Sequence, residues 1–135
     1  MTRRQLHIFR SIFVLYLVAV LWLCFGTFSH TPHVDRFYFG LPADKVAHFL
    51  LFLPFPVLAF LAFDKYTETF WSPVGYTALT FFCGCLLAAG TEVGQTLLTS
   101  TRTGDPADFR ADLIGLATGS LLVFIFDLSK QRRHE

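Results

Sequence analysis

The sequence predicts an all-α membrane protein, a bundle of four transmembrane helices with both termini in the cytoplasm. Three observations lead to this prediction. Hydrophobic residues make up 53% of the 135 residues and charged residues only 16%, and the mean hydropathy is +0.51, which is outside the usual soluble range. Four apolar segments follow one another along the chain, and Lys and Arg are concentrated on one side of them. A chain of this length has room for one domain, so residues 1–135 are expected to form a single membrane domain.

The first expected span covers residues 11–28, a run without charged residues. At about 1.5 Å per residue such a helix is about 27 Å long, close to the roughly 30 Å hydrocarbon core of a bilayer. A secretory signal is the alternative, because Arg3, Arg4 and Arg10 precede the run. The run is long for the apolar core of a signal and no small-residue cleavage site follows it, so a membrane span is favoured.

The second span is expected at residues 46–63, which are apolar except for His48. Two prolines, Pro54 and Pro56, lie inside it. Proline lacks a backbone N–H and collides with the preceding turn, so this helix should be kinked.

The third span is expected at residues 74–98 and the fourth at residues 107–127. The uninterrupted apolar part of the fourth, residues 113–126, is too short by itself to cross a bilayer. A start of the fourth helix at residue 107 is supported by Asp105, a good N-cap, and by Pro106, which fits the first helical position.

The distribution of Lys and Arg predicts the orientation, because cytoplasmic loops of membrane proteins carry the excess of these residues. Seven of them lie near the termini or in the loop between the second and third spans, and four lie on the other side, within residues 29–45 and 99–110. Both termini are therefore expected in the cytoplasm. The seven are Arg3, Arg4, Arg10, Lys65, Lys130, Arg132 and Arg133, and the four are Arg36, Lys45, Arg102 and Arg110.

With this orientation, the unusual polar residues fall at the outer ends of three helices, about 6 to 9 Å deep at 1.5 Å per residue. A carboxylate inside a membrane costs roughly 2.5 kcal/mol or more and is treated as functional by default, which applies most to Glu92 and Asp112. We therefore predict an outer polar site, with Asp44 beside it, made of Lys45, His48, Glu92, Gln95, Arg102, Asp105, Asp108 and Asp112.

Several of these residues also have a purely structural interpretation. Asp105 can be an N-cap, and Asp108 and Asp44 can each stabilise the start of a helix through its dipole. His48 can be a structural histidine near the interface, and Arg110 can extend its charge to the headgroups.

Two Gly-x-x-x-Gly motifs, at residues 90–94 and 115–119, lie in the third and fourth spans. Small residues at this spacing allow helix backbones to approach closely. The motifs predict a tight hairpin of these two helices, which would bring Glu92 and Gln95 towards the acidic residues that begin the fourth.

Together, these blocks resemble the VanZ-like family of small integral membrane proteins over about residues 44–119. The resemblance implies a multi-pass protein of the bacterial cytoplasmic membrane that acts in the cell envelope, and the founding relative is associated with resistance to the glycopeptide teicoplanin. Asp112 stands where the family pattern usually has Asn. The residues that carry the resemblance are Asp44, Lys45, His48 and Phe49, then Glu92 and Gln95, then Arg102, Asp105, Asp108, Asp112 and Gly115.

The leading hypothesis is a site that binds or handles a phospholipid headgroup or a lipid-linked cell-wall precursor. Lys45 and Arg102 are expected to contact its phosphate, and His48 and Gln95 to add hydrogen bonds. Because carboxylates outnumber these cations, an anionic ligand needs protonated carboxylates or a bridging cation.

The first alternative is a membrane-embedded, metal-assisted hydrolase or transferase acting on such a lipid, in which carboxylates and His48 hold a divalent cation and His48 or Glu92 is the general base. No dedicated metal motif is present, so the metal and any cofactor stay unassigned. The second alternative is a structural network of buried charges. The expected partners are membrane lipids. Nucleic acid is not an expected partner, because the net charge is only +1. The sequence does not decide whether the chain forms a homo-oligomer.

Overall fold

The computed structural model is an almost entirely helical bundle. The α-helices of the described residues are α1 (Arg3–Phe25), α2 (Ala43–Phe52), α3 (Pro54–Phe70), α4 (Pro73–Leu98) and α5 (Pro106–Gln131). Strands β1 (Phe37–Tyr38) and β2 (Leu41–Pro42) pair antiparallel just before α2, with Gly40 at a φ of 79° in the turn. The structure describes residues 2–26, 37–38, 40–70, 72–98 and 104–131.

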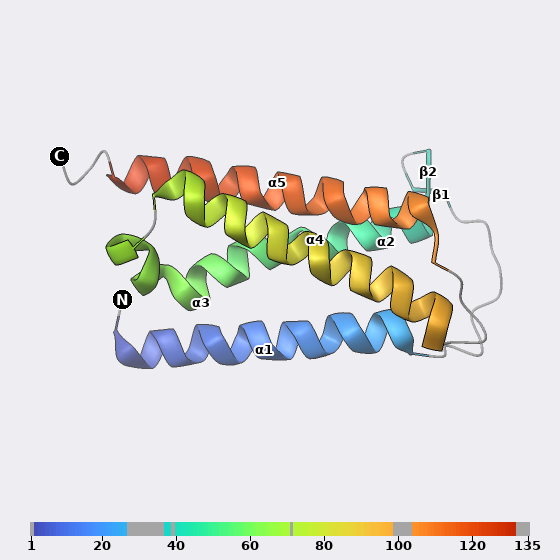
Figure 1. Ribbon diagram of the computed structural model, residues 1–135, viewed down its shortest axis with the longest axis horizontal. Helices are drawn as coiled ribbons and strands as arrows, with labels where there is room; N and C mark the ends of the chain where they lie inside the picture. The colour runs from blue at the N-terminus through green and yellow to red at the C-terminus, as the bar shows by residue number, and fades with distance from the viewer. Residues whose placement is uncertain (1, 27–36, 39, 71, 99–103, 132–135) are drawn as a thin grey trace.

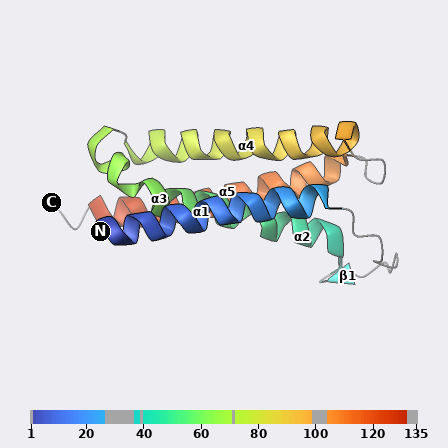
Figure 2. The same cartoon turned by 90° about the horizontal axis from the view of Figure 1, so that it is seen from below.

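Four segments of the described chain are long and apolar enough to cross a membrane, as predicted: Arg3–Phe25, Ala43–Phe63, Pro73–Leu98 and Pro106–Ser129. They run side by side, and α1 begins at the same end of the bundle at which α5 ends (Figure 1). Helix α4 lies along one side of the other helices (Figure 2). Because the described chain has four such segments, the start of α1 and the end of α5 lie on the same side of a bilayer.

Helix α1 extends beyond its apolar run because a capping box forms at its start. The Thr2 hydroxyl oxygen accepts from the backbone N–H of Gln5 at 3.2 Å, and the Gln5 side chain accepts from the backbone N–H of Thr2 at 2.9 Å. These two bonds satisfy donors that the first helical turn would otherwise leave unpaired. The helix begins at Arg3, before the predicted residue 11.

The second span is divided into α2 and α3 at Leu53, as the two prolines predict. The Leu53 N–H still donates to the Phe49 carbonyl at 3.0 Å, but Pro54 and Pro56 have no N–H to continue the ladder. The Tyr16 hydroxyl of α1 donates to the Leu51 carbonyl at 2.6 Å. A polar side chain of the first span therefore supports the second just before its break.

The glycine motifs do not act as predicted. Gly115 and Gly119 of α5 lie against the proline break rather than against α4. A Cβ on Gly115 would come within 2.5 Å of the Phe49 carbonyl oxygen, and a Cβ on Gly119 would collide with the Leu53 carbonyl oxygen. In α4, a Cβ on Gly90 would meet nothing within 4 Å. Helices α4 and α5 do pack together as expected, but at Gly84, where a Cβ would collide with the Leu116 side chain of α5.

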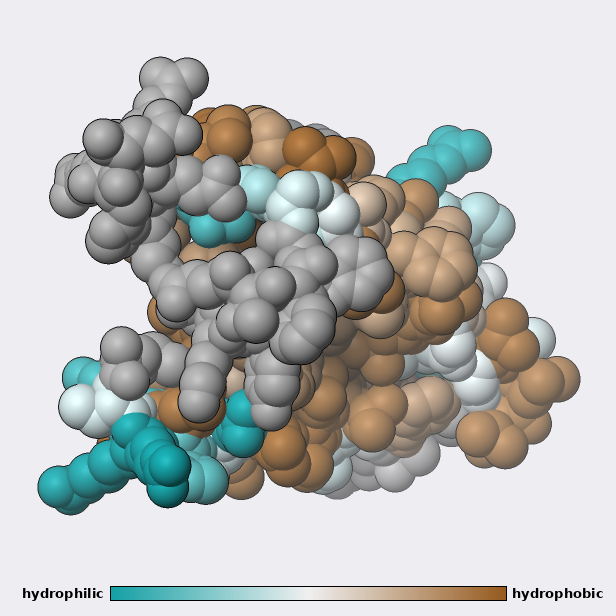
Figure 3. Space-filling model, turned by 60° about the vertical axis from the view of Figure 1, so that its left-hand side comes forward, coloured by the Kyte–Doolittle hydropathy of each residue, from teal (hydrophilic) through white to brown (hydrophobic). Residues whose placement is uncertain are grey.

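The core and the outer surface are both apolar. Buried side chains from α1, the second span, α4 and α5 form the main core, while many large hydrophobic residues are exposed. Figure 3 shows hydrophobic side chains over much of the visible surface. Such a surface suits contact with lipid, because acyl chains carry no penalty for meeting it. The main core consists of Val20, Cys24, Phe52, Phe55, Ala88 and Leu116.

Candidate functional site

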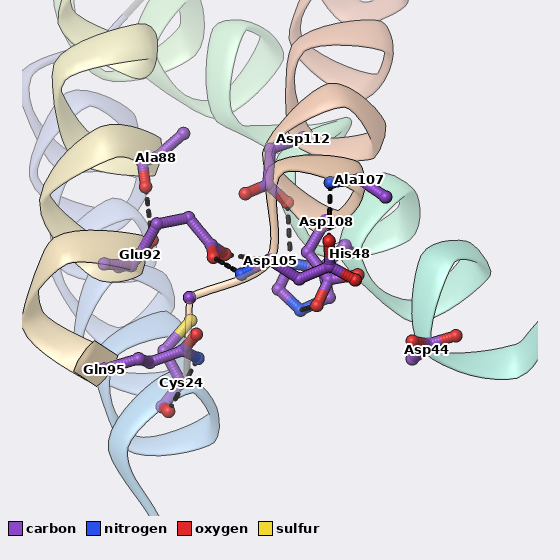
Figure 4. Close-up of polar contacts among 12 residues, drawn as sticks. Cys24, Asp44, His48, Ala88, Glu92, Gln95, Asp105, Ala107, Asp108 and Asp112 are labelled. Atoms are coloured by element: carbon purple, nitrogen blue, oxygen red, sulfur yellow. Dashed lines mark hydrogen bonds and ion pairs between the residues drawn. The ribbon is translucent and has the colours of Figure 1, made fainter. Parts of the chain in front are cut away.

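Most of the predicted site residues that the structure describes gather at one end of the bundle. Helices α2 and α5 begin there and α4 ends there, so three helix ends deliver polar side chains to one place (Figure 1). We call this place the polar end. Figure 4 shows its side chains, with His48, Glu92, Asp105, Asp108 and Asp112 close together and Asp44 further out.

Lys45 is surrounded by carboxylates. Its ammonium donates to Asp44 at 3.1 Å, to Asp105 at 2.7 Å and to Asp108. A lysine ammonium has three donors, and these three contacts use all of them. The expected contact between Lys45 and a phosphate is therefore not supported, because this ammonium has no donor left for one.

His48 lies among three carboxylates. Its Nδ1 atom is 2.9 Å from Oδ1 of Asp112 and 4.0 Å from Oε1 of Glu92, and its Nε2 atom is 3.6 Å from Oδ2 of Asp108. Asp112 is completely buried. An ionised Asp112 requires the proton on Nδ1, which fixes the ring orientation and leaves Nε2 on the side of Asp108.

Glu92 connects the end of α4 to the start of α5. Its Oε2 atom accepts from the backbone N–H of Asp105 at 2.8 Å. The chain passes close to α4 here because residue 104 is a glycine: a Cβ at Gly104 would come within 2.6 Å of the Glu92 carbonyl oxygen. The Gly104 N–H also donates to the hydroxyl of Thr96 at 2.9 Å. This junction holds the Glu92 side chain beside the acidic first turns of α5.

Asp105 is both an N-cap of α5 and a member of the cluster. Its Oδ1 atom accepts from the N–H of Ala107 at 2.8 Å, while its Oδ2 atom accepts from Lys45. The hydrogen bond from the Lys45 ammonium, with that from the Ala107 N–H, holds the pKa of Asp105 below its usual range. The structural interpretation of Asp105 and its place in the site therefore do not exclude each other.

Two predicted site residues are not part of this cluster as described. Gln95 is buried, but its amide donates to the Cys24 carbonyl of α1 at 3.0 Å, and Figure 4 shows this pair apart from the carboxylates. The structural role of Gln95 is therefore to join α4 to α1. Arg102 lies outside the described residues.

A cavity of about 320 Å³ adjoins the cluster between the end of α4 and the start of α5. This volume is at the lower end of the roughly 300 to 1,000 Å³ usual for small-molecule sites. Most residues of its wall could not be identified from the sequence, because an apolar residue among apolar residues is not distinctive. The cavity is lined by Ala89, Glu92, Val93, Thr96, Gly104, Asp105, Pro106 and Phe109.

The polar end has an excess of acceptors. Five carboxylates face one ammonium and one imidazole among the residues that the structure describes there. Two buried carboxylate oxygens, Oε1 of Glu92 and Oδ2 of Asp112, have no hydrogen-bond partner in the described part of the chain. His48, Glu92 and Asp108 each offer one ligand atom within 4.8 Å of the others. A cation, or a ligand rich in hydroxyl or ammonium donors, is what such a site can accept.

Buried polar residues also occur outside the cluster. Ser120 and Asp127 of α5 and Thr80 and Thr91 of α4 are all buried. The Thr91 hydroxyl donates to the carbonyl of Ala88 at 2.8 Å, so it is satisfied within its own helix. The sequence did not single out these residues, because serine and threonine are common in membrane helices and Asp127 borders the basic C-terminal flank.

Fold and site together define a small polytopic membrane protein with a buried polar cluster at one end of a four-span bundle. Residues 13–127 match the model of the VanZ/LLP1 family. The chain belongs to this family, which confirms the resemblance seen in its motifs. The matched residues include every described residue of the cluster. No curated protein and no solved structure matched the chain.

Proposed function

We propose that this protein binds the headgroup of a phospholipid or of a lipid-linked envelope precursor at the outer face of the bacterial cytoplasmic membrane. The observation that carries the proposal is the cavity between α4 and α5, because it joins an apolar wall to the polar cluster. Ala89, Val93 and Phe109 belong to the apolar wall, and Glu92 and Asp105 belong to the cluster.

A lipid fits this combination better than a soluble ligand does. Val93 of the cavity wall is 57% exposed, and Leu97, one turn further along α4, is 74% exposed, so we expect the face of α4 beside the cavity to meet acyl chains in a bilayer. A ligand can then leave its acyl or prenyl chain in the membrane while its headgroup reaches Glu92 and Asp105. Such a ligand loses little apolar contact with the bilayer on binding.

The described polar end offers mainly acceptors, so the headgroup is recognised through its own donors or through a cation. Hydroxyl groups of a sugar or glycerol headgroup can donate to carboxylates such as Glu92. A phosphate needs a cation between itself and these carboxylates, since like charges at short range repel strongly.

The outer location rests on the distribution of Lys and Arg along the sequence, where seven of them lie in the N-terminal segment, between the second and third spans, and in the C-terminal segment. On the positive-inside rule these three segments are cytoplasmic, and the polar end, where α2 and α5 begin, is on the other side. The polar end then meets lipids of the outer leaflet, where lipid-linked wall precursors are used. The resistance to glycopeptides suggested by the family resemblance would follow from handling of such a precursor.

Filling the cavity tests this proposal. In Val93→Trp the indole occupies the space of the ligand, and we expect the protein in nanodiscs to bind added phosphatidylglycerol or polyprenyl phosphate at least about tenfold more weakly, a change of about 1.4 kcal/mol. Native mass spectrometry measures the bound lipid, and the two probes distinguish a phospholipid from a precursor carrier.

The matched control is Leu86→Trp. Leu86 lies two turns before Val93 on α4 and is similarly exposed, 59% against 57%, but it does not line the cavity. Equal lipid binding by the two variants and the wild type would contradict the proposal.

The second candidate is a membrane-embedded hydrolase or transferase acting on such a lipid. The observation that favours it is the pairing of His48 with Asp112 at 2.9 Å, beside the Oε1 atom of Glu92. An imidazole held in one tautomer by a carboxylate can act as a general base. We expect the wild type to release phosphate from polyprenyl diphosphate and His48→Asn not to release it. If the folded wild type releases no phosphate with Mn²⁺ or Mg²⁺, this candidate is excluded.

A further inference from the structure

We infer that His48, Glu92 and Asp108 bind one divalent cation of the first transition row, such as Mn²⁺ or Zn²⁺. The role of this cation rests on the proposed function. The inference deepens that function by naming the group that would meet a phosphate at the polar end.

The distances fit shared coordination. The Nε2 atom of His48 lies 3.6 Å from Oδ2 of Asp108, and each of the three residues has a ligand atom within 4.8 Å of the others. Metal–nitrogen and metal–oxygen bonds of about 2.0 to 2.2 Å place two ligands of one ion about 3 to 4 Å apart. The 4.8 Å limit among one ligand atom of each residue exceeds this range by only about 1 Å.

Glu92 supplies a second observation that points to a ligand. Its side chain is 10% exposed, and its Oε1 atom is buried without a hydrogen-bond partner among the described residues. This atom faces the ring of His48, at 4.0 Å from Nδ1. A buried carboxylate oxygen left unpaired is costly, and a cation between Glu92 and His48 removes that cost.

Each of the three side chains uses one polar atom to contact a neighbouring residue and has a second polar atom that can bind an ion. His48 is held at Nδ1 by Asp112, Glu92 at Oε2 by the Asp105 N–H, and Asp108 at Oδ1 by Lys45. The atoms that these contacts leave available are Nε2 of His48, Oε1 of Glu92 and Oδ2 of Asp108. Outer partners that fix the orientation of each ligand are characteristic of built metal sites. Lys45 then has a definite role, which is to orient Asp108 rather than to contact a phosphate.

The donor set indicates the kind of metal. An imidazole with two carboxylates suits Mn²⁺, Fe²⁺ or Zn²⁺, whereas Ca²⁺ and Mg²⁺ prefer sites made of oxygen ligands alone. Three protein ligands leave coordination positions for an outside oxygen, such as that of a phosphate. Since Glu92 also lines the cavity, an ion bound to it lies beside the proposed lipid headgroup.

The cation also corrects the charge balance of the polar end. Asp44, Asp105 and Asp108 share the single ammonium of Lys45, while Glu92 and the buried Asp112 have only His48. A dication offsets this excess of negative charge without any change in the described hydrogen bonds.

The test is titration of the purified full chain in nanodiscs with MnCl₂ alone. Electron paramagnetic resonance measures bound Mn²⁺, and pulsed experiments detect coupling to a histidine nitrogen. We expect one bound ion with a nitrogen signal that is absent in His48→Asn. We expect Glu92→Gln and Asp108→Asn to bind at least about tenfold more weakly, the lower limit for loss even of an outer partner.

Asp44→Asn is the matched control, because it removes a carboxylate from the same Lys45 without removing a proposed ligand. Its Mn²⁺ affinity should stay within about threefold of the wild type, as expected for a charge that is 56% exposed. Glu92→Gln is expected to fold, since Gln keeps the shape, keeps an oxygen for the Asp105 N–H and removes a buried negative charge. Its melting temperature checks this.

Wild-type protein that binds no Mn²⁺ or Zn²⁺, or binds Mn²⁺ without a nitrogen signal, would overturn the inference. Equal loss of affinity in Asp44→Asn and Glu92→Gln would also overturn it, since the ion would then be attracted by charge alone. Lipid binding measured with and without chelator separates this result from the proposed function, because lipid can bind without metal and metal without lipid.

Discussion

At the scale of single residues, each acidic residue at the polar end has a different environment, although their sequence spacing makes them look alike. Asp44 is 56% exposed, whereas the side chain of Asp112 is completely buried. The sequence could predict that Glu92 and Asp112 would face the protein interior, because a lipid-facing carboxylate is too costly. It could not predict that all three donors of the Lys45 ammonium would be used, since the partners come from α2 and from the start of α5 and are brought together only by the fold.

Lys45→Met tests the role of this lysine. Loss of the ammonium leaves Asp105 and Asp108 facing each other without a cation, so we expect the variant to be less stable by about 2 kcal/mol, typical of a charged hydrogen bond lost at a partly buried site. Thermal unfolding in detergent measures the loss, with the exposed Arg3→Met as control.

The stability difference should depend on pH. The pKa of Asp105 is lowered in the folded chain, first by Lys45, so its contribution is present above the unfolded value of about 3.9 and is lost as the pH falls through the folded value. The gap between wild type and Lys45→Met should therefore narrow in acid. A gap that is constant from pH 7 to pH 3 would contradict this account.

At the scale of helices, composition and periodicity predicted the spans and the proline break, because both depend on local properties. Apolar length predicts a membrane helix, and a proline removes a donor wherever it stands. The partners of each helix were less predictable. Gly115 and Gly119 fit the proline break, and Gln95 reaches α1, because spacing predicts which residues share a face but not which helix that face meets.

Alanine substitutions in the two glycine motifs test this assignment. In Gly115→Ala the new Cβ would come within 2.5 Å of the Phe49 carbonyl oxygen, and we expect a loss of about 1 to 3 kcal/mol from overpacking. Gly90→Ala places its Cβ in open space and is expected to be neutral or more stable by up to about 1 kcal/mol.

The melting temperatures of the two variants show which of the two glycines lies in a close helix contact. Equal destabilisation by both would mean that Gly90 also lies in a close helix contact. Because Gly115 follows Asp112 by less than one helical turn, Gly115→Ala should also weaken any ligand binding at the polar end.

At the scale of the whole molecule, the described structure separates a largely apolar bundle from one polar end. Three helix ends meet there, and the cavity between α4 and α5 joins that end to the lipid-facing surface. The sequence predicted the convergence from the topology, because alternating spans place these three ends on one side. It did not predict the cavity, which depends on how two helices diverge.

Reporter fusions to the C-terminus test which side the polar end faces. The positive-inside rule predicts a cytoplasmic C-terminus, so a fused green fluorescent protein should fluoresce and a fused alkaline phosphatase should be inactive. The reverse pattern would place the polar end in the cytoplasm and exclude ligands confined to the outer leaflet.

The central claim, that a lipid headgroup binds at the polar end, is tested most directly by photocrosslinking in the native membrane. A photoreactive amino acid is placed at Val93, in the cavity wall, or at Leu86, on the same helix outside the cavity. Mass spectrometry then identifies the attached lipids. The account predicts that Val93 captures one lipid class strongly enriched over the adducts of Leu86. The same mixture of bulk lipids at both positions would contradict it.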